Sequence, residues 1–140
     1  KRQLLVDEDE QLAYVLNEVK IKFVNFGYKV EHPIKFNTII TAPSLLTLAA
    51  IKAHEMGNDK KWENFVDMYF VVKGFFSVGD VVKEAQRIFG SDFSEDKFRN
   101  QLQNFENVKQ EKEIEFAEGN EVGEEEIKEF LGEKVKEVSE

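Results

Sequence analysis

Residues 49–70 read AAIKAHEMGNDKKWENFVDMYF, and they determine the fold because two helical patterns meet in them across a short polar turn. Apolar residues recur at three- and four-residue spacing over residues 43–56 and again over residues 62–73. This spacing predicts two helices, each with an apolar stripe. The connection at residues 57–60 is short enough to fold the two helices back on each other as an antiparallel hairpin.

Each helix of the predicted hairpin has one charged residue among apolar neighbours, Lys52 in the first and Asp67 in the second. The stripe of the first helix comprises Leu45, Leu48, Ala49, Lys52 and Met56, and that of the second comprises Trp62, Phe65, Val66, Tyr69 and Val72 around Asp67. A charge among apolar side chains needs a partner, and removing one member of a buried pair costs about 3–5 kcal/mol. The two residues are therefore predicted to form either a buried salt bridge or a polar site.

The N-terminal part of the chain alternates between apolar and polar side chains, which is typical of strands. The predicted strands are residues 11–16, 19–26, 28–30 and 34–40. The first two form a β-hairpin that turns at residues 17–18, and Pro33 separates the last two because a central strand does not tolerate proline. The acidic run at residues 7–10 reads as a solvated turn between strands rather than as a metal site.

Three further helices are predicted after the hairpin: one that opens at Ser77, one that is capped by Ser94, and one that begins at Glu124. Asp80 follows Ser77 at the third position, as in a capping box. The three apolar stripes are Val78, Val81, Val82, Ala85, Ile88 and Phe89; Phe98, Leu102 and Phe105; and Ile127, Phe130, Leu131, Val135 and Val138. A short strand at residues 114–116 is predicted before the last helix.

These patterns predict an α+β fold, in which a small N-terminal antiparallel sheet is followed by a helical layer of about five helices. We expect one domain over residues 1–140, with a β-rich part at 1–41, a helical part at 42–106 and an acidic strand-helix extension at 107–140. A chain of 140 residues with 41% hydrophobic residues and thirteen phenylalanines is long enough to bury a core.

Composition excludes several classes of function. A net charge of -9 disfavours nonspecific nucleic-acid binding, because phosphate contacts need clustered lysine and arginine. The absence of cysteine excludes disulfides and thiolate chemistry and agrees with a cytoplasmic location. No apolar run is long enough to span a bilayer, so no membrane partner is expected. His32 and His54 lack metal-ligand spacing and are predicted to be surface or packing residues, and no metal ligands are assigned.

The hairpin resembles that of the AbiEii abortive-infection nucleotidyltransferase toxin family, whose members read Ala-x-Lys-x-x-Ala-x-x-Arg, then Lys-Asp, two residues and Asp-Leu-Tyr-Phe. The matching residues are Ala50, Lys52, Trp62, Asp67, Tyr69 and Phe70. Residues 19–24 (VKIKFV) resemble the family's preceding strand, and residues 98–107 (FRNQLQNFEN) resemble a later segment with leucine, two residues, phenylalanine and an acid. The resemblance covers most of the chain.

The sequence also departs from the family pattern. Asn58 and Asp59 stand where the family has arginine, and Glu63 and Asn64 stand where it has Lys-Asp. Residues 1–41 contain neither the family's glycine-rich turn nor its paired Asp-x-Asp carboxylates. Nucleotidyl transfer uses such carboxylates to hold divalent metal ions against the triphosphate. We therefore expect this chain to be the C-terminal part of a longer nucleotidyltransferase-like protein and to be inactive alone.

The resemblance implies magnesium and a nucleoside triphosphate as ligands, an RNA or protein acceptor of the nucleotidyl group, and a small antitoxin as partner. Nucleic acid would then be only a substrate of the full-length protein. The implied catalytic residues are Lys52, near the triphosphate, and Asp67, which positions it or the attacking group. An alternative stays open: a noncatalytic protein-interaction module derived from that family, which binds a partner through its acidic C-terminal helix or a hydrophobic surface.

Overall fold

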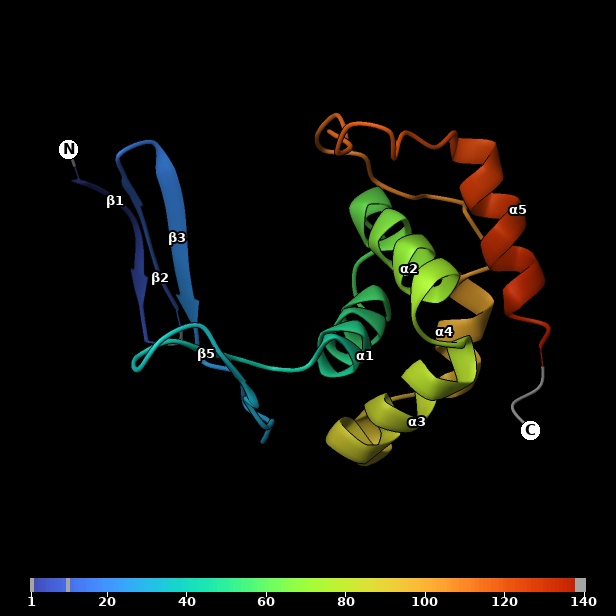
Figure 1. The fold of residues 1–140 in the computed structure, drawn as a ribbon, viewed down its shortest axis with the longest axis horizontal. Coiled ribbons are helices and arrows are strands. Elements are labelled where there is room, and N and C mark those ends of the chain that lie inside the picture. Colours follow the sequence, from blue (N-terminus) through green and yellow to red (C-terminus); the bar gives the residue numbers. More distant parts are fainter. Residues whose placement is uncertain (1, 10, 138–140) are drawn as a thin grey trace.

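The computed structural model describes residues 2–9 and 11–137 and has an α+β architecture, as the sequence predicts (Figure 1). An antiparallel sheet of three strands opens the chain, in the order β1 (Arg2–Glu8), β2 (Gln11–Leu16) and β3 (Val19–Val24). Five α-helices follow it within the described residues. The predicted order, with the sheet first and the helices after it, is confirmed.

Of the two predicted turns of the sheet, the one at residues 17–18 is confirmed, and the acidic one is shorter than predicted. The first two acids of the run predicted as a turn, Asp7 and Glu8, belong instead to β1 and pair with Leu12 and Gln11. Asp9 lies in the turn before β2, and Glu10 lies outside the described residues. The second turn has Asn17 and Glu18 at φ 49° and 67°. Positive φ at both central residues matches the right-handed twist of the two strands that the turn joins.

The strands predicted after the sheet form differently. Residues 28–30 are not a strand, and only β4 (Ile34–Lys35) and β5 (Thr41–Ala42) pair, in a separate two-stranded sheet. Asn37 explains the short ladder, because its Oδ1 accepts the backbone N–H groups of Ile39 and Ile40 at 2.7 Å and folds the segment into a tight turn. Side-chain hydrogen bonding of this kind competes with strand formation.

The helical hairpin is present as α1 (Leu45–Met56) and α2 (Trp62–Gly74). The first helix starts two residues later than predicted because Ser44 caps it, with its Oγ accepting the N–H of Thr47 at 3.2 Å. The stripe predicted for α1 is only partly the buried one. Its buried residues are Thr47, Ala49, Ala50, Ala53 and Met56, whereas Leu45 and Leu48 are exposed.

The remaining helices are α3 (Val78–Phe89), α4 (Glu95–Gln101) and α5 (Glu124–Lys134), with a short 3-10 helix, η1 (Gly90–Asp92), after α3. The capping box at the start of α3 is confirmed, since Ser77 and Asp80 exchange backbone-to-side-chain hydrogen bonds at 3.0 Å. Ser94 caps α4 in the predicted way. Residues 114–116 form no strand, although Ile114 and Phe116 pack against the core.

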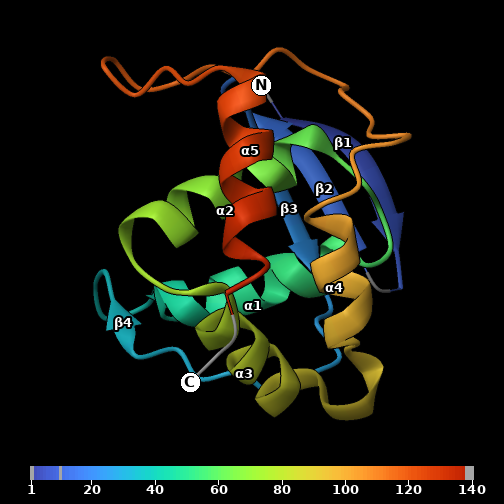
Figure 2. The same ribbon diagram turned by 90° about the vertical axis from the view of Figure 1, so that its right-hand side faces the viewer.

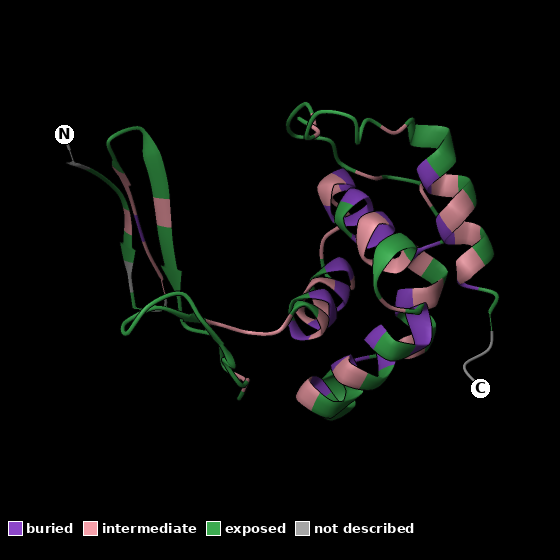
Figure 3. Ribbon diagram, in the orientation of Figure 1, coloured by how far each residue is buried: buried purple, intermediate pink, exposed green. Residues whose placement is uncertain are grey.

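The core lies among the helices (Figure 3). The last helix, α5, contributes Ile127 and Leu131 to the core, and Val135 follows at the C-terminal cap of the helix. The helix lies against α2 (Figure 2), which confirms its predicted docking. Val138 of its predicted stripe lies outside the described residues. The sheet stands beside the helices, and of its described residues only Ala13 is buried. None of the helices in the described residues is both long and apolar enough to cross a membrane.

Candidate functional site

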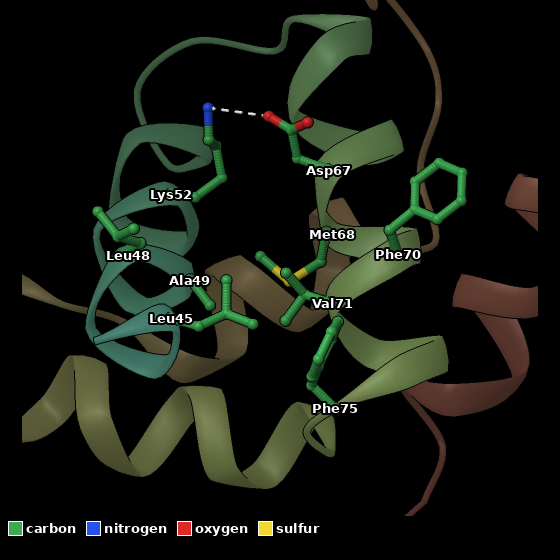
Figure 4. A pocket seen from close by; sticks show the side chains of 9 residues that line it. All are labelled: Leu45, Leu48, Ala49, Lys52, Asp67, Met68, Phe70, Val71 and Phe75. Atoms are coloured by element: carbon green, nitrogen blue, oxygen red, sulfur yellow. Dashed lines mark ion pairs between the residues drawn. The ribbon is translucent and has the colours of Figure 1, made fainter. Parts of the chain in front are cut away.

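Lys52 and Asp67 face each other across the hairpin, with Lys52 Nζ 3.1 Å from Asp67 Oδ2 (Figure 4). Lys52 lies in the second half of α1, and Asp67 lies near the middle of α2. The short turn after Met56 folds α2 back along α1 and brings the two residues to the same height. The predicted pairing across the hairpin is therefore present.

The pair is not buried, which rules out the buried salt bridge, one of the two alternatives that the sequence leaves open. The Lys52 side chain is 32% exposed and that of Asp67 is 56% exposed. The reason is that α1 turns its alanine face toward the core and leaves Leu48 and Lys52 at the rim. Water screens such a pair, so its contribution to stability is about 0–1 kcal/mol rather than 3–5 kcal/mol.

An apolar groove of about 320 Å³ separates α1 from α2 below this ion pair. Its lining residues are Leu45, Leu48, Ala49, Lys52, Asp67, Met68, Phe70, Val71 and Phe75. Ala49, Met68 and Val71 lie in its middle, and the ion pair is at one end and Phe75 at the other (Figure 4). The sequence analysis did not identify this groove. A signal for it was present, because α1 has two neighbouring apolar stripes, one with Leu45 and Leu48 and one rich in alanine.

The residues that match the family pattern fall into two structural groups. Ala50, Trp62 and Tyr69 are buried in the core. Lys52, Asp67 and Phe70 line the groove. The first group is explained by packing alone, so only the second group is placed where it could contact a ligand.

A second polar cluster joins α2 to α5, and sequence reasoning did not identify it. The hydroxyl of Tyr69 donates to Glu126 Oε1 at 2.7 Å, and Lys73 Nζ donates to the same hydroxyl and lies 3.4 Å from Glu126 Oε1. The hydrogen bond with Tyr69 raises the pKa of Lys73, and the one from Tyr69 lowers the pKa of Glu126. The charged forms of Lys73 and Glu126 are thus favoured, as expected for an interaction that holds α2 and α5 together.

His54 has a packing role, in line with the prediction for it. Its ring stacks on that of Phe89 with centroids 4.0 Å apart, and the ring of Tyr28 meets both at their edges. The Tyr28 hydroxyl donates to Asp92 Oδ2 at 2.9 Å, and this bond raises the pKa of Tyr28. These contacts anchor the segment that follows the sheet to α1 and α3.

The donor set at the groove does not fit a magnesium ion. Asp67 is the one carboxylate among the lining residues, and Lys52 already neutralises it. Magnesium ions that act on triphosphates are bound by one or two carboxylates that are free to coordinate, together with the phosphates of the substrate. Across residues 2–9 and 11–137, no three histidine, aspartate or glutamate residues lie together as a metal site.

None of the protein-family models, curated proteins or solved structures compared with the chain matches it. The resemblance to the AbiEii family therefore rests on the residues of the hairpin and its flanking segments, and the roles of Lys52 and Asp67 stay predictions.

Proposed function

We propose that the chain is the hairpin-bearing part of an AbiEii-type nucleotidyltransferase, and that it supplies Lys52 and Asp67 to a nucleotide site. The observation that carries this proposal is the water-accessible ion pair at the end of an apolar groove. The groove volume of about 320 Å³ is at the lower end of the range for small-molecule sites. Apolar walls with a few polar groups at one end are typical of such sites.

The arrangement supports distinct roles for the two charged residues. Asp67 holds the Lys52 ammonium at the end of the groove, 3.1 Å away. A phosphate oxygen is a second acceptor for the same ammonium, because the ion pair is exposed and costs little to open. In this proposal the base lies along Met68 and Val71, and the lysine contacts the phosphates.

Magnesium belongs to this proposal only as an ion held elsewhere. When bound, it would neutralise charge on the triphosphate as the nucleotidyl group is transferred. Since the groove has a single carboxylate, the metal-binding carboxylates would come from another polypeptide segment. The acceptor, an RNA or a protein, and a small antitoxin partner are implied in the same way by the family resemblance.

The direct test is to measure nucleotide binding to the chain by NMR, in titrations with each of the four nucleoside triphosphates. We expect dissociation constants of about 1 mM, the strength of a few contacts, with shift changes at Lys52, Asp67 and Met68. Lys52→Ala should weaken binding about tenfold, the effect of one lost charge-assisted bond. Lys112→Ala is the matched control, because it removes one positive charge from an exposed residue outside the groove lining.

Equal weakening by Lys52→Ala and Lys112→Ala would show that only net charge matters and would contradict the proposal. So would the absence of binding at several millimolar triphosphate. Shift changes outside the groove alone would place the nucleotide elsewhere.

A noncatalytic protein-interaction module is the second candidate function. Exposed apolar residues on the sheet favour it, since Val19 is 61% exposed and Phe23 is 55% exposed. Large apolar patches on a protein surface usually mark a binding surface. Failure to bind any triphosphate, together with a stoichiometric complex with one protein partner, would favour this module over the nucleotidyltransferase part.

A further inference from the structure

On one face of the sheet, apolar side chains from all three strands lie next to one another. The strand register places Tyr14 between Leu4 and Ile21, and it pairs Leu12 with Phe23 and Leu16 with Val19. Because residues that pair across strands share a face, these seven side chains lie on one side of the sheet. Leu4, Leu16, Val19 and Phe23 of this set are exposed. We call these seven residues the apolar sheet face.

One edge of the same sheet is an open strand. The sheet order places β3 next to β2 alone, and the backbone of residues 19–24 has no further hydrogen bond to the rest of the described chain. The strand reads VKIKFV, with no proline or glycine to interrupt pairing, and all its residues except Ile21 are exposed. An apolar strand with an open edge is a template for another strand.

Two lysines lie on the opposite side of β3 from the apolar sheet face. Lys20 and Lys22 alternate with Val19, Ile21 and Phe23, and their cross-strand neighbours are Val15 and Ala13. Neither lysine forms an ion pair with a residue that the structure describes. The plainer interpretation is that these lysines protect the edge, because lysine on an edge strand discourages pairing with the wrong chain.

The lysine positions argue against a second copy of this chain at the edge. When two β3 strands pair antiparallel with their apolar sides aligned and most residues matched, Lys22 faces either Lys20 or Lys22 of the other copy. Like charges directly opposite each other destabilise a strand pair. The β3 edge therefore disfavours pairing with the β3 edge of a second copy. It favours a strand that has negative charges opposite Lys20 and Lys22.

We propose that the open edge of β3 binds a strand from another protein in which apolar and acidic residues alternate. The apolar residues of that strand extend the apolar sheet face beyond Val19, Ile21 and Phe23. Its carboxylates lie on the other side and pair with Lys20 and Lys22. Backbone hydrogen bonds supply the affinity and the alternating side chains supply the specificity, as in other cases of strand addition. This partner surface is separate from the groove and does not depend on nucleotide binding.

The test compares two fluorescein-labelled peptides on the full chain by fluorescence anisotropy. One peptide has the sequence Thr-Val-Glu-Val-Glu-Val-Thr, and the other has lysine in place of both glutamates. We expect the acidic peptide to bind about tenfold more tightly, since it replaces two like-charge cross-strand pairs by two opposite-charge pairs. The double variant Lys20→Glu/Lys22→Glu should reverse this preference.

The control variant is Lys112→Glu/Lys136→Glu, which makes the same change in net charge at two exposed residues outside the sheet. It should leave the preference for the acidic peptide in place, because only residues on β3 contact the peptide. Four results would overturn the proposal: no binding of either peptide, equal affinity for both, an unchanged preference in Lys20→Glu/Lys22→Glu, or a dimer of the chain that Phe23→Lys dissociates.

Discussion

At the end of the groove, the Lys52 ammonium and the Asp67 carboxylate lie 3.1 Å apart, and both side chains are accessible to water, that of Lys52 in part and that of Asp67 for more than half of its surface. Screening by water then limits how much the ion pair contributes to the free energy of unfolding. The sequence pattern alone favours a buried pair, because both residues stand among apolar neighbours. The difference matters for function, since an exposed pair is free to exchange one member for a ligand at small cost.

We predict that Lys52→Met lowers the free energy of unfolding by no more than about 1 kcal/mol, the upper end for an exposed ion pair. Methionine keeps the apolar part of the lysine side chain against the groove and removes only the charge. Urea unfolding followed by circular dichroism measures the change. Phe65→Ala serves as the reference for a buried site and should cost about 3–5 kcal/mol, because Phe65 is fully buried. A loss near that of Phe65→Ala for Lys52→Met would show that the pair is structural.

At the scale of elements, the Tyr69, Lys73 and Glu126 cluster ties α5 to α2 and makes stability depend on pH. The hydrogen bond from Tyr69 lowers the pKa of Glu126 below the ordinary value of 4.5. A carboxylate with a lowered pKa in the folded state contributes stability above its unfolded pKa, and this contribution is lost as pH falls through the lower, folded pKa. The cluster should therefore weaken in acid, below about pH 4.5.

We predict that Glu126→Gln lowers the stability at pH 7 and makes it less dependent on pH below about 4.5, since the group that takes up the proton is gone. Urea midpoints at pH 7 and pH 3.5 for the two proteins measure the effect. The control is Glu129→Gln on the same helix. The carboxylate of Glu129 is exposed and has no hydrogen bond or ion pair with the described residues. Parallel pH profiles for the native protein and Glu126→Gln would contradict the prediction.

The elements also show how far the sequence predicts this structure. The α3 helix is predictable because its signals are local: Ser77 and Asp80 cap it, and one apolar stripe dominates it. The buried face of α1 is not predictable in this way, because Leu48 and Ala50 both lie on apolar stripes. Only packing against α3 determines that the alanine face is the buried one. The contact between Tyr69 and Glu126 joins residues 57 positions apart, and no local pattern specifies it.

At the scale of the whole molecule, burial is uneven. The helices hold the core, while the described part of the sheet adds one buried residue, Ala13. A small sheet is stable on its own only when it has at least three strands with an apolar face, or when it packs against a helix. Here that face and the β3 edge are open, so the strands depend on their own pairing and on the anchor at Tyr28.

We predict that amides of β1, β2 and β3 exchange at least about a hundredfold faster than those of α1, α2 and α3, because openings of the sheet expose little buried apolar surface. Hydrogen exchange followed by mass spectrometry, with peptides that separate the sheet from the hairpin, measures the ratio. The acidic peptide described above should slow exchange in β3 without changing exchange in α2, since a bound strand protects the edge it pairs with. Equal protection of sheet and helices in the free chain would mean that the sheet shares the stability of the helical core and needs no partner.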